Sequence, residues 1–235
     1  MQSDPDRTAA TDGAKGAHAR PLRARAMRAS AITVGGHLAS QLLRIGSNMT
    51  LTRLLFPEAF GVMALVQVVL TGLEMISDVG IQPSIVQHAR GEEPTFLNTA
   101  WTIQAIRGFS LWLGGMAVAA PFAWFYGEPQ LAALIPVAAV SAALSGLNSP
   151  KLALLSRRMA VGPSVLIDLA AQIGSIVLMI GLALAYRSLW ALVAGGVFSS
   201  AIKMALSHLA LPGPRSRFQW ERAARRDLVR FGKWI

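Results

Sequence analysis

The sequence predicts an all-α, polytopic membrane protein whose core is a bundle of six transmembrane helices. The first observation is composition: 53% of the 235 residues are hydrophobic and 14% are charged, whereas about 25% of a soluble domain is charged. The second is layout, because the apolar residues gather in blocks of roughly 20, the length of a helix that crosses a bilayer. The third is charge, because Lys and Arg concentrate in alternate connections between the blocks, as the orientation of a membrane protein requires.

Each apolar block is expected to be one membrane-spanning helix. The six blocks cover residues 30–51, 59–81, 99–122, 131–154, 163–184 and 189–211. Lipid offers no partner to free backbone amides, so a span is either a helix or a strand of a closed barrel. Barrel strands are alternating segments of about ten residues. These blocks are roughly twice as long and do not alternate, which favours helices.

Basic segments flank the predicted bundle of residues 30–211. Residues 1–29 are rich in Ala, Gly, Asp and Arg and lack an apolar period, which predicts a disordered basic cytoplasmic tail. Residues 212–235 predict a basic cytoplasmic linker, with an amphipathic helix over 215–231 that lies on the anionic inner leaflet. Residues 231–235 resemble the entry to a seventh span, so we expect the chain to be part of a longer protein.

The orientation follows from the placement of the cations. Seventeen of the 22 Lys and Arg residues lie in the N-terminal tail, in the second and fourth connections, or after residue 211. The odd-numbered connections hold only two, Arg53 and Arg187. Cytoplasmic loops carry the excess of Lys and Arg in membrane proteins. We therefore expect the N-terminus and residue 235 to lie in the cytoplasm.

Several functional classes are excluded. The net charge of +10 does not indicate a nucleic-acid partner, because most of the cations flank apolar blocks and no nucleic-acid-binding motif is present. The absence of cysteine excludes disulfides, thiolate catalysis and Cys-ligated metals. The motifs GxxxxGK[ST], HExxH and GxSxG are also missing. We therefore expect a protein that is not an enzyme, with no catalytic residue, metal or cofactor.

Polar residues form stripes inside the predicted spans, where they are costly and are usually placed for function. Spacings of three and four residues put the members of a stripe on one helical face. The candidates for a substrate cavity are Gln41, Arg44 and Asn48 with His37 in the first span, Gln104 and Arg107 with Asn98 and Trp101 in the third, and Lys203 in the sixth. The candidates for coupling or ion pairing are Glu74, Asp78 and Asp168.

Two interpretations of these stripes stay open. In the first, they converge on a water-filled cavity, where the cations attract an anionic group and the carboxylates carry protons. In the second, the residues pair with one another and hold the bundle together, which the equal number of embedded acids and bases permits. Small residues at every fourth position, Ala138, Ala142 and Gly146, predict close helix packing in the fourth span.

Several segments together resemble a known family of transporters. LTRLLFPEAFG at 51–61, followed by VMAL at 62–65, matches the pattern L-x-R-x-L-x-P-x-x-F-G-x-x-A-L of polysaccharide flippases. DVGIQPSIVQ at 78–87, LLSRRM at 154–159 and the segment 212–218 are similar to further parts of these proteins. The chain therefore resembles the N-terminal half of a polysaccharide transporter, the branch of the multidrug, oligosaccharidyl-lipid and polysaccharide exporters that includes the Wzx-type flippases.

The resemblance implies a function. Such a protein moves an undecaprenyl-pyrophosphate-linked oligosaccharide across the bacterial cytoplasmic (inner) membrane for O-antigen, capsule or exopolysaccharide biosynthesis, beside a polysaccharide polymerase and glycosyltransferases. Arg44, Arg107 and Lys203 would then contact pyrophosphate or acidic sugars, and Glu74 and Asp78 would couple the cycle. A MATE-type antiporter of drugs or metabolites is an alternative, disfavoured by the PEAFG motif and by the balanced charge. A non-transporting membrane subunit is a third.

Overall fold

The chain consists of helices joined by loops in the part that its structure, a computed structural model, describes. This part is residues 1–235 without 1–5, 78–79, 214–215 and 233–235. The helices are α1 Asp6–Leu54, α2 Pro57–Ser77, α3 Ile81–Gln87, α4 Pro94–Tyr126, α5 Leu131–Gly146, α6 Lys151–Arg157, α7 Gly162–Tyr186, α8 Trp190–Leu209 and α9 Arg222–Gly232. No strand occurs among the described residues. The predicted all-α class is confirmed.

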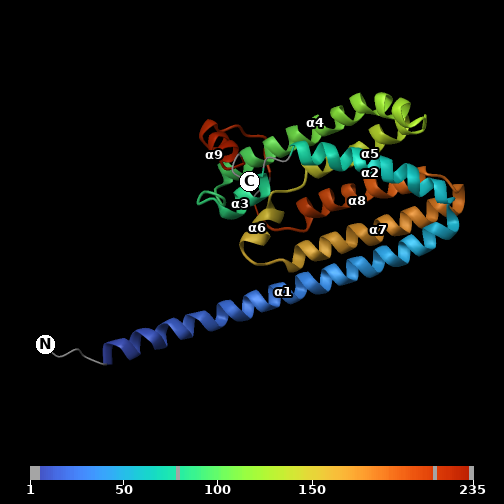
Figure 1. The fold of residues 1–235 in the computed structure, drawn as a ribbon. Helices are drawn as coiled ribbons and strands as arrows, with labels where there is room; N and C mark the ends of the chain where they lie inside the picture. Colours follow the sequence, from blue (N-terminus) through green and yellow to red (C-terminus); the bar gives the residue numbers. More distant parts are fainter. Residues whose placement is uncertain (1–5, 78–79, 214–215, 233–235) are drawn as a thin grey trace.

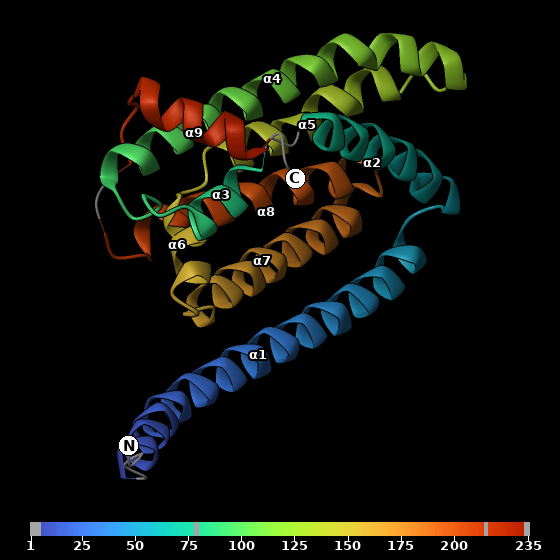
Figure 2. The same cartoon turned by 60° about the vertical axis from the view of Figure 1, so that its left-hand side comes forward.

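Within these described residues, six long helices lie side by side, and three short ones gather at one end (Figure 1). α4 packs on α5, α5 on α8, α8 on α7, and α7 on α1, while α2 lies against α4 and α5. Figure 2 shows the same order from another side. The short helices α3, α6 and α9 form what we call the α9 end. The turns between α1 and α2, α4 and α5, and α7 and α8 form the opposite end.

The apolar helices make the chain a multi-pass membrane protein. Within the described residues, α2, α4, α7 and α8 are each long and apolar enough to cross a membrane, and α5 with α6 adds a fifth span if this bent pair is counted as one. α1 is not in this set, because His37, Gln41, Arg44 and Asn48 lower the mean hydropathy of its second half. The first predicted span, at residues 30–51, therefore stays a prediction.

The fourth predicted span, 131–154, is not one straight helix. α5 ends at Gly146, α6 begins at Lys151, and the two are bent by 59°. Proline at 150 has no amide hydrogen to donate to a helix, so the helix breaks ahead of it. Neighbouring helices satisfy the freed backbone: Ser149 N donates to Ser207 Oγ at 3.0 Å. The Leu147 carbonyl accepts from Trp101 Nε1 at 3.3 Å and contacts His208 Nε2 at 2.8 Å.

Both flanking segments differ from their predictions. α1 begins at Asp6, where the sequence predicts a disordered tail over 1–29, and Ala and Arg in this segment favour helix. Its first half runs away from the other helices (Figures 1 and 2).

α9 begins at Arg222, later than the amphipathic helix expected over 215–231. Its apolar side chains Ala224 and Leu228 are buried against Ile85 and Phe96, so that side packs on the protein and not on the leaflet.

Small residues bring α4 and α5 into backbone contact, as the sequence predicts. Ala138, Ala142 and Gly146 are all buried. A Cβ added to Gly146 would lie 2.9 Å from the Cα of Gly108 and 2.8 Å from the carbonyl oxygen of Gln104. This crossing sets the position of the polar residues on α4.

Candidate functional site

A polar pocket of about 270 Å³ lies beside the crossing of α4 and α5. It is lined by Glu74 of α2, Gln82 of α3, Gln104, Arg107, Gly108 and Leu111 of α4, Ala142, Ser145 and Gly146 of α5, Asn148 of the break, and Lys203 of α8. Four of the predicted site residues, Glu74, Gln104, Arg107 and Lys203, are thus brought together from three helices.

Arg107 connects α4 to the last turn of α2. Its Nε donates to Ser77 Oγ at 3.1 Å, and its Nη2 donates to the backbone carbonyl of Glu74 at 3.1 Å. The last carbonyls of a helix lack partners within that helix, and a cation near them is favourable. The guanidinium therefore fixes the end of α2 at the pocket.

Lys203 and Asp168 form an ion pair between α8 and α7. Lys203 Nζ lies 2.6 Å from Asp168 Oδ1, with 38% and 55% of the two side chains exposed. Asp168 does not line the polar pocket. The pair joins Asp168 to a residue of the pocket, and its predicted role in coupling or ion pairing stays a prediction.

One pocket atom has no hydrogen-bond partner. Asn148 Oδ1 is buried and unpartnered among the described residues, and Asn148 lies on the pocket wall. An unsatisfied buried acceptor costs about 1–3 kcal/mol. The nearby amide of Gln104 is satisfied, because its Nε2 donates to the Ser145 carbonyl at 3.1 Å.

The polar stripe of α1 lies outside the polar pocket. α1 packs on α7 through Gly36, which meets Val165, and through Ser40, which exchanges hydrogen bonds with Gln172 at 2.5 and 2.9 Å. This contact leaves the other face exposed. The exposed residues of that face are Gln41, Arg44 and Asn48, whose predicted cavity role stays a prediction.

His37 and Asp78 are the two remaining predicted site residues. His37 lines a smaller pocket of about 210 Å³ between α1 and α7, together with Asp168. Asp78 lies outside the described residues. Within the described part of the chain, no group of three or more His, Asp or Glu side chains is placed to hold a metal ion.

Asn98 has a different role from the rest of its stripe. With Thr99 and Thr102, it holds the non-helical linker that precedes α9. The backbone amides of 217, 219 and 221 donate to Asn98 Oδ1, Thr102 Oγ1 and Thr99 Oγ1 at 3.1–3.2 Å. Trp101 stacks at 4.6 Å on Phe218 of the linker. The threonines of α4 were not recognised from the sequence, although Thr102, four residues after Asn98, shares its helical face.

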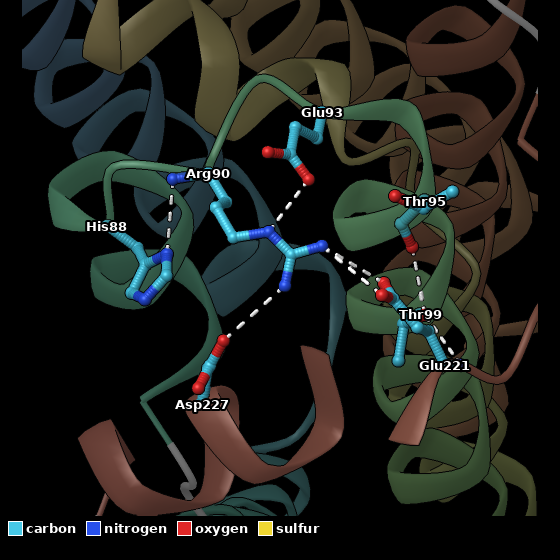
Figure 3. Close-up of polar contacts among 7 residues, drawn as sticks. All are labelled: His88, Arg90, Glu93, Thr95, Thr99, Glu221 and Asp227. Carbon is cyan, nitrogen blue, oxygen red and sulfur yellow. Dashed lines mark hydrogen bonds and ion pairs between the residues drawn. The ribbon is translucent and has the colours of Figure 1, made fainter. Parts of the chain in front are cut away.

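Arg90 joins the loop before α4 to the linker and α9 (Figure 3). Its guanidinium lies 2.8 Å from Glu93, 3.2 Å from Glu221 and 3.6 Å from Asp227. The hydrogen bonds with Glu93 and then Glu221 raise the pKa of Arg90 above its ordinary value. A comparable contact joins the same loop to α6, where the hydrogen bond from Arg158 lowers the pKa of Glu92.

Comparison with known proteins identifies the family. Residues 50–235 match the sequence model of a family described as "Polysaccharide biosynthesis protein". The chain belongs to this polysaccharide biosynthesis protein family. The match includes the segments at 51–65, 78–87, 154–159 and 212–218 from which the resemblance was drawn, so the predicted family of polysaccharide transporters is confirmed.

One relative in this comparison has a name that refers to transport. The chain is 27% identical over 183 residues to the succinoglycan biosynthesis transport protein ExoT of Rhizobium meliloti (strain 1021). The aligned region covers 77% of this chain and 37% of the relative. No solved structure matches the chain. The family and its relative place the chain among polysaccharide-related transporters.

Proposed function

We propose that the chain forms part of a transporter that moves an undecaprenyl-pyrophosphate-linked oligosaccharide across the bacterial cytoplasmic membrane for polysaccharide biosynthesis. The observation that carries the proposal is the polar pocket, which lies among apolar helices and holds Arg107, Lys203 and the unpartnered Asn148 Oδ1. Polar groups within membrane-spanning segments are costly and usually mark the path of a substrate. The family membership and the transport name of the relative point to the same function.

The cationic side chains of the pocket suit an anionic group. Arg107 and Lys203 line it with one carboxylate, Glu74, and Lys203 also pairs with Asp168 outside the lining, so the charges at the pocket are balanced. Guanidinium and ammonium groups are the usual ligands of phosphate. Arg107 and Lys203 would bind the diphosphate, while Gln104 and Asn148 would bind sugar hydroxyls. The balanced charge also disfavours the antiporter alternative, because a cationic drug would favour an acidic site.

The size of the pocket limits what it holds. Pockets for drug-sized ligands have about 300–1,000 Å³, and this one has about 270 Å³. It fits the diphosphate with one adjacent sugar, and the rest of the substrate needs further surface. The exposed face of α1 with Gln41, Arg44 and Asn48 would supply part of it. Glu74, Asp78 and Asp168 would couple the cycle to an ion.

The predicted orientation places the α9 end in the cytoplasm, because the second and fourth connections and the C-terminal segment lie there. Transport would then proceed by alternating access, with this bundle and a second one rocking around the substrate. The substrate would come from glycosyltransferases and pass to a polymerase on the other side. The non-transporting subunit stays the alternative, and the relative's greater length argues against it.

The test is polysaccharide export by cells that make the complete gene product. Arg107→Gln with Lys203→Gln is expected to reduce exported polysaccharide by at least tenfold, since two charged hydrogen bonds are lost, and lipid-linked oligosaccharide is expected to accumulate. Arg217→Gln is the matched control, because this exposed side chain lies outside the pocket. Normal export by the double variant at wild-type protein levels would refute the pocket assignment. Normal export after gene deletion would refute the function.

A further inference from the structure

Lys151 is a buried cation without a carboxylate partner. Its exposed fraction is 9%. Its Nζ donates to the backbone carbonyl of Leu211 at 2.9 Å, and no ion pair includes it among the described residues. An ammonium group has three donors, and burial of an uncompensated charge costs several kcal/mol. This position therefore favours an anion from outside the chain.

The space beside Lys151 is a second pocket, at the α9 end. It measures about 200 Å³ and lies between the start of α4, α6 and the linker after α8. Leu97, Leu154 and Leu155 form part of its apolar wall, and Arg158 lines it with Glu92. Arg158 Nη2 lies 3.0 Å from Glu92 Oε2, so these two charges compensate each other. The ammonium of Lys151 is left as the net charge of the pocket.

The lining of this pocket suits a ligand that is anionic at one end and apolar beside it. A cation beside leucine walls fits a phosphate ester with carbon groups next to the phosphate. The pocket is smaller than the usual 300–1,000 Å³ of drug-sized sites, so it takes a head group and not a glycan chain. It lies where the apolar helix α8 ends and α4 begins, and the ends of membrane-spanning helices are where lipid head groups are expected. Basic pockets between membrane helices bind anionic lipids in this way.

We propose that this pocket binds the phosphate of an anionic phospholipid, with Lys151 as its charged ligand. The lipid would occupy the space between α4, α6 and residues 211–213 with Ser216. These residues lead directly to the linker that Asn98, Thr99 and Thr102 hold. The bound lipid would therefore stabilise the arrangement of α6 and the linker at the α9 end. This site is separate from the polar pocket and does not depend on the proposed transport function.

The test measures lipids bound to the purified full chain by native mass spectrometry, with phosphatidylglycerol and phosphatidylcholine offered in equal amounts. The wild type is expected to retain phosphatidylglycerol over phosphatidylcholine by about tenfold, the effect of one charged hydrogen bond. Lys151→Met is expected to lose this preference. Arg226→Gln is the matched control, because it removes one positive charge from the exposed surface of α9 and should leave the preference unchanged.

A second variant covers the case in which Lys151→Met fails to fold. Leu155→Trp fills the pocket and leaves the Lys151 contact with Leu211 in place, and it too is expected to lose the preference. Equal binding of the two lipids by the wild type, or a normal preference in both variants, would overturn the proposal and leave Lys151 as a cap for the Leu211 carbonyl. Full displacement of the lipid by millimolar inorganic phosphate would overturn the assignment to lipid in favour of soluble phosphate.

Discussion

Replacing Gly108 by alanine puts a methyl group where the backbone of α5 already lies. The added Cβ would be 2.8 Å from the Ala142 carbonyl oxygen, 2.9 Å from Gly146 Cα and 3.2 Å from Gly146 N. All three are backbone atoms, so no side-chain rotation relieves the contact. Carbon atoms pack at about 3.5–4.0 Å, so α4 and α5 must separate by at least about 0.6 Å at this point.

The expected cost is about 1–3 kcal/mol, the usual range for overpacking in a well-packed core. A gain in helix propensity of about 0.8–1.0 kcal/mol opposes it. Gly114→Ala isolates the steric part, because Gly114 lies on the same helix and its added Cβ would meet only Leu73 Cδ2 at an ordinary 3.5 Å. Both variants have the same propensity gain. Gly108→Ala should therefore be less stable than Gly114→Ala by about 1–3 kcal/mol.

Thermal unfolding of the purified chain in detergent, followed by tryptophan fluorescence, measures this difference. Gly146→Ala provides a replicate from the other helix, since its Cβ would meet Gln104 O and Gly108 Cα. If Gly108→Ala and Gly146→Ala unfold at the same temperature as Gly114→Ala, the close crossing of α4 and α5 is wrong, and with it the placement of Arg107 and Gln104 at the pocket.

Three further predictions concern the α9 end and the break after α5. Leu228→Ala removes a side chain that is 3% exposed, so α9 should lose hydrogen-exchange protection, with a cost of about 2–5 kcal/mol. Ser207→Ala leaves the buried Ser149 amide unsatisfied, and unfolding should show a loss of about 1–3 kcal/mol. Arg158 lowers the pKa of Glu92. Their contact therefore stabilises the fold at pH values above the ordinary carboxyl pKa of about 4.3. This stabilisation is lost as the pH falls through the lowered pKa of Glu92. Glu92→Gln should therefore show a weaker loss of stability in acid than the wild type.

The apolar helices were predictable because lipid imposes strict requirements on a span. The predicted 163–184 and 189–211 correspond to α7 Gly162–Tyr186 and α8 Trp190–Leu209. Length and hydropathy decide such elements, and both can be read from the sequence. The break at 147–150 was missed because 131–154 is apolar enough for one span. Proline at 150 was its signal, and the partners that make the break tolerable, Ser207 and His208, come from another helix.

The site was predictable only in part, since spacing shows which residues share a face but not what that face meets. Gln104 and Arg107 reach the polar pocket because the Gly108 crossing holds α4 against α5. Asn98 begins the same stripe, but it lies closer to the α9 end and binds the linker. Arg44 belongs to the regular polar stripe of α1. However, α1 packs against α7 with a different face. These outcomes depend on tertiary contacts that no local pattern contains.

The central claim is that the polar pocket belongs to a transporter of lipid-linked oligosaccharide. Its most direct test is the movement of a fluorescent diphosphate-linked oligosaccharide between the leaflets of vesicles that contain the complete gene product. We expect the wild-type protein to give transfer well above that of protein-free vesicles, and Arg107→Gln with Lys203→Gln to give transfer at the protein-free rate. Wild-type protein that transfers no faster than empty vesicles, or a double variant as fast as the wild type, would contradict it.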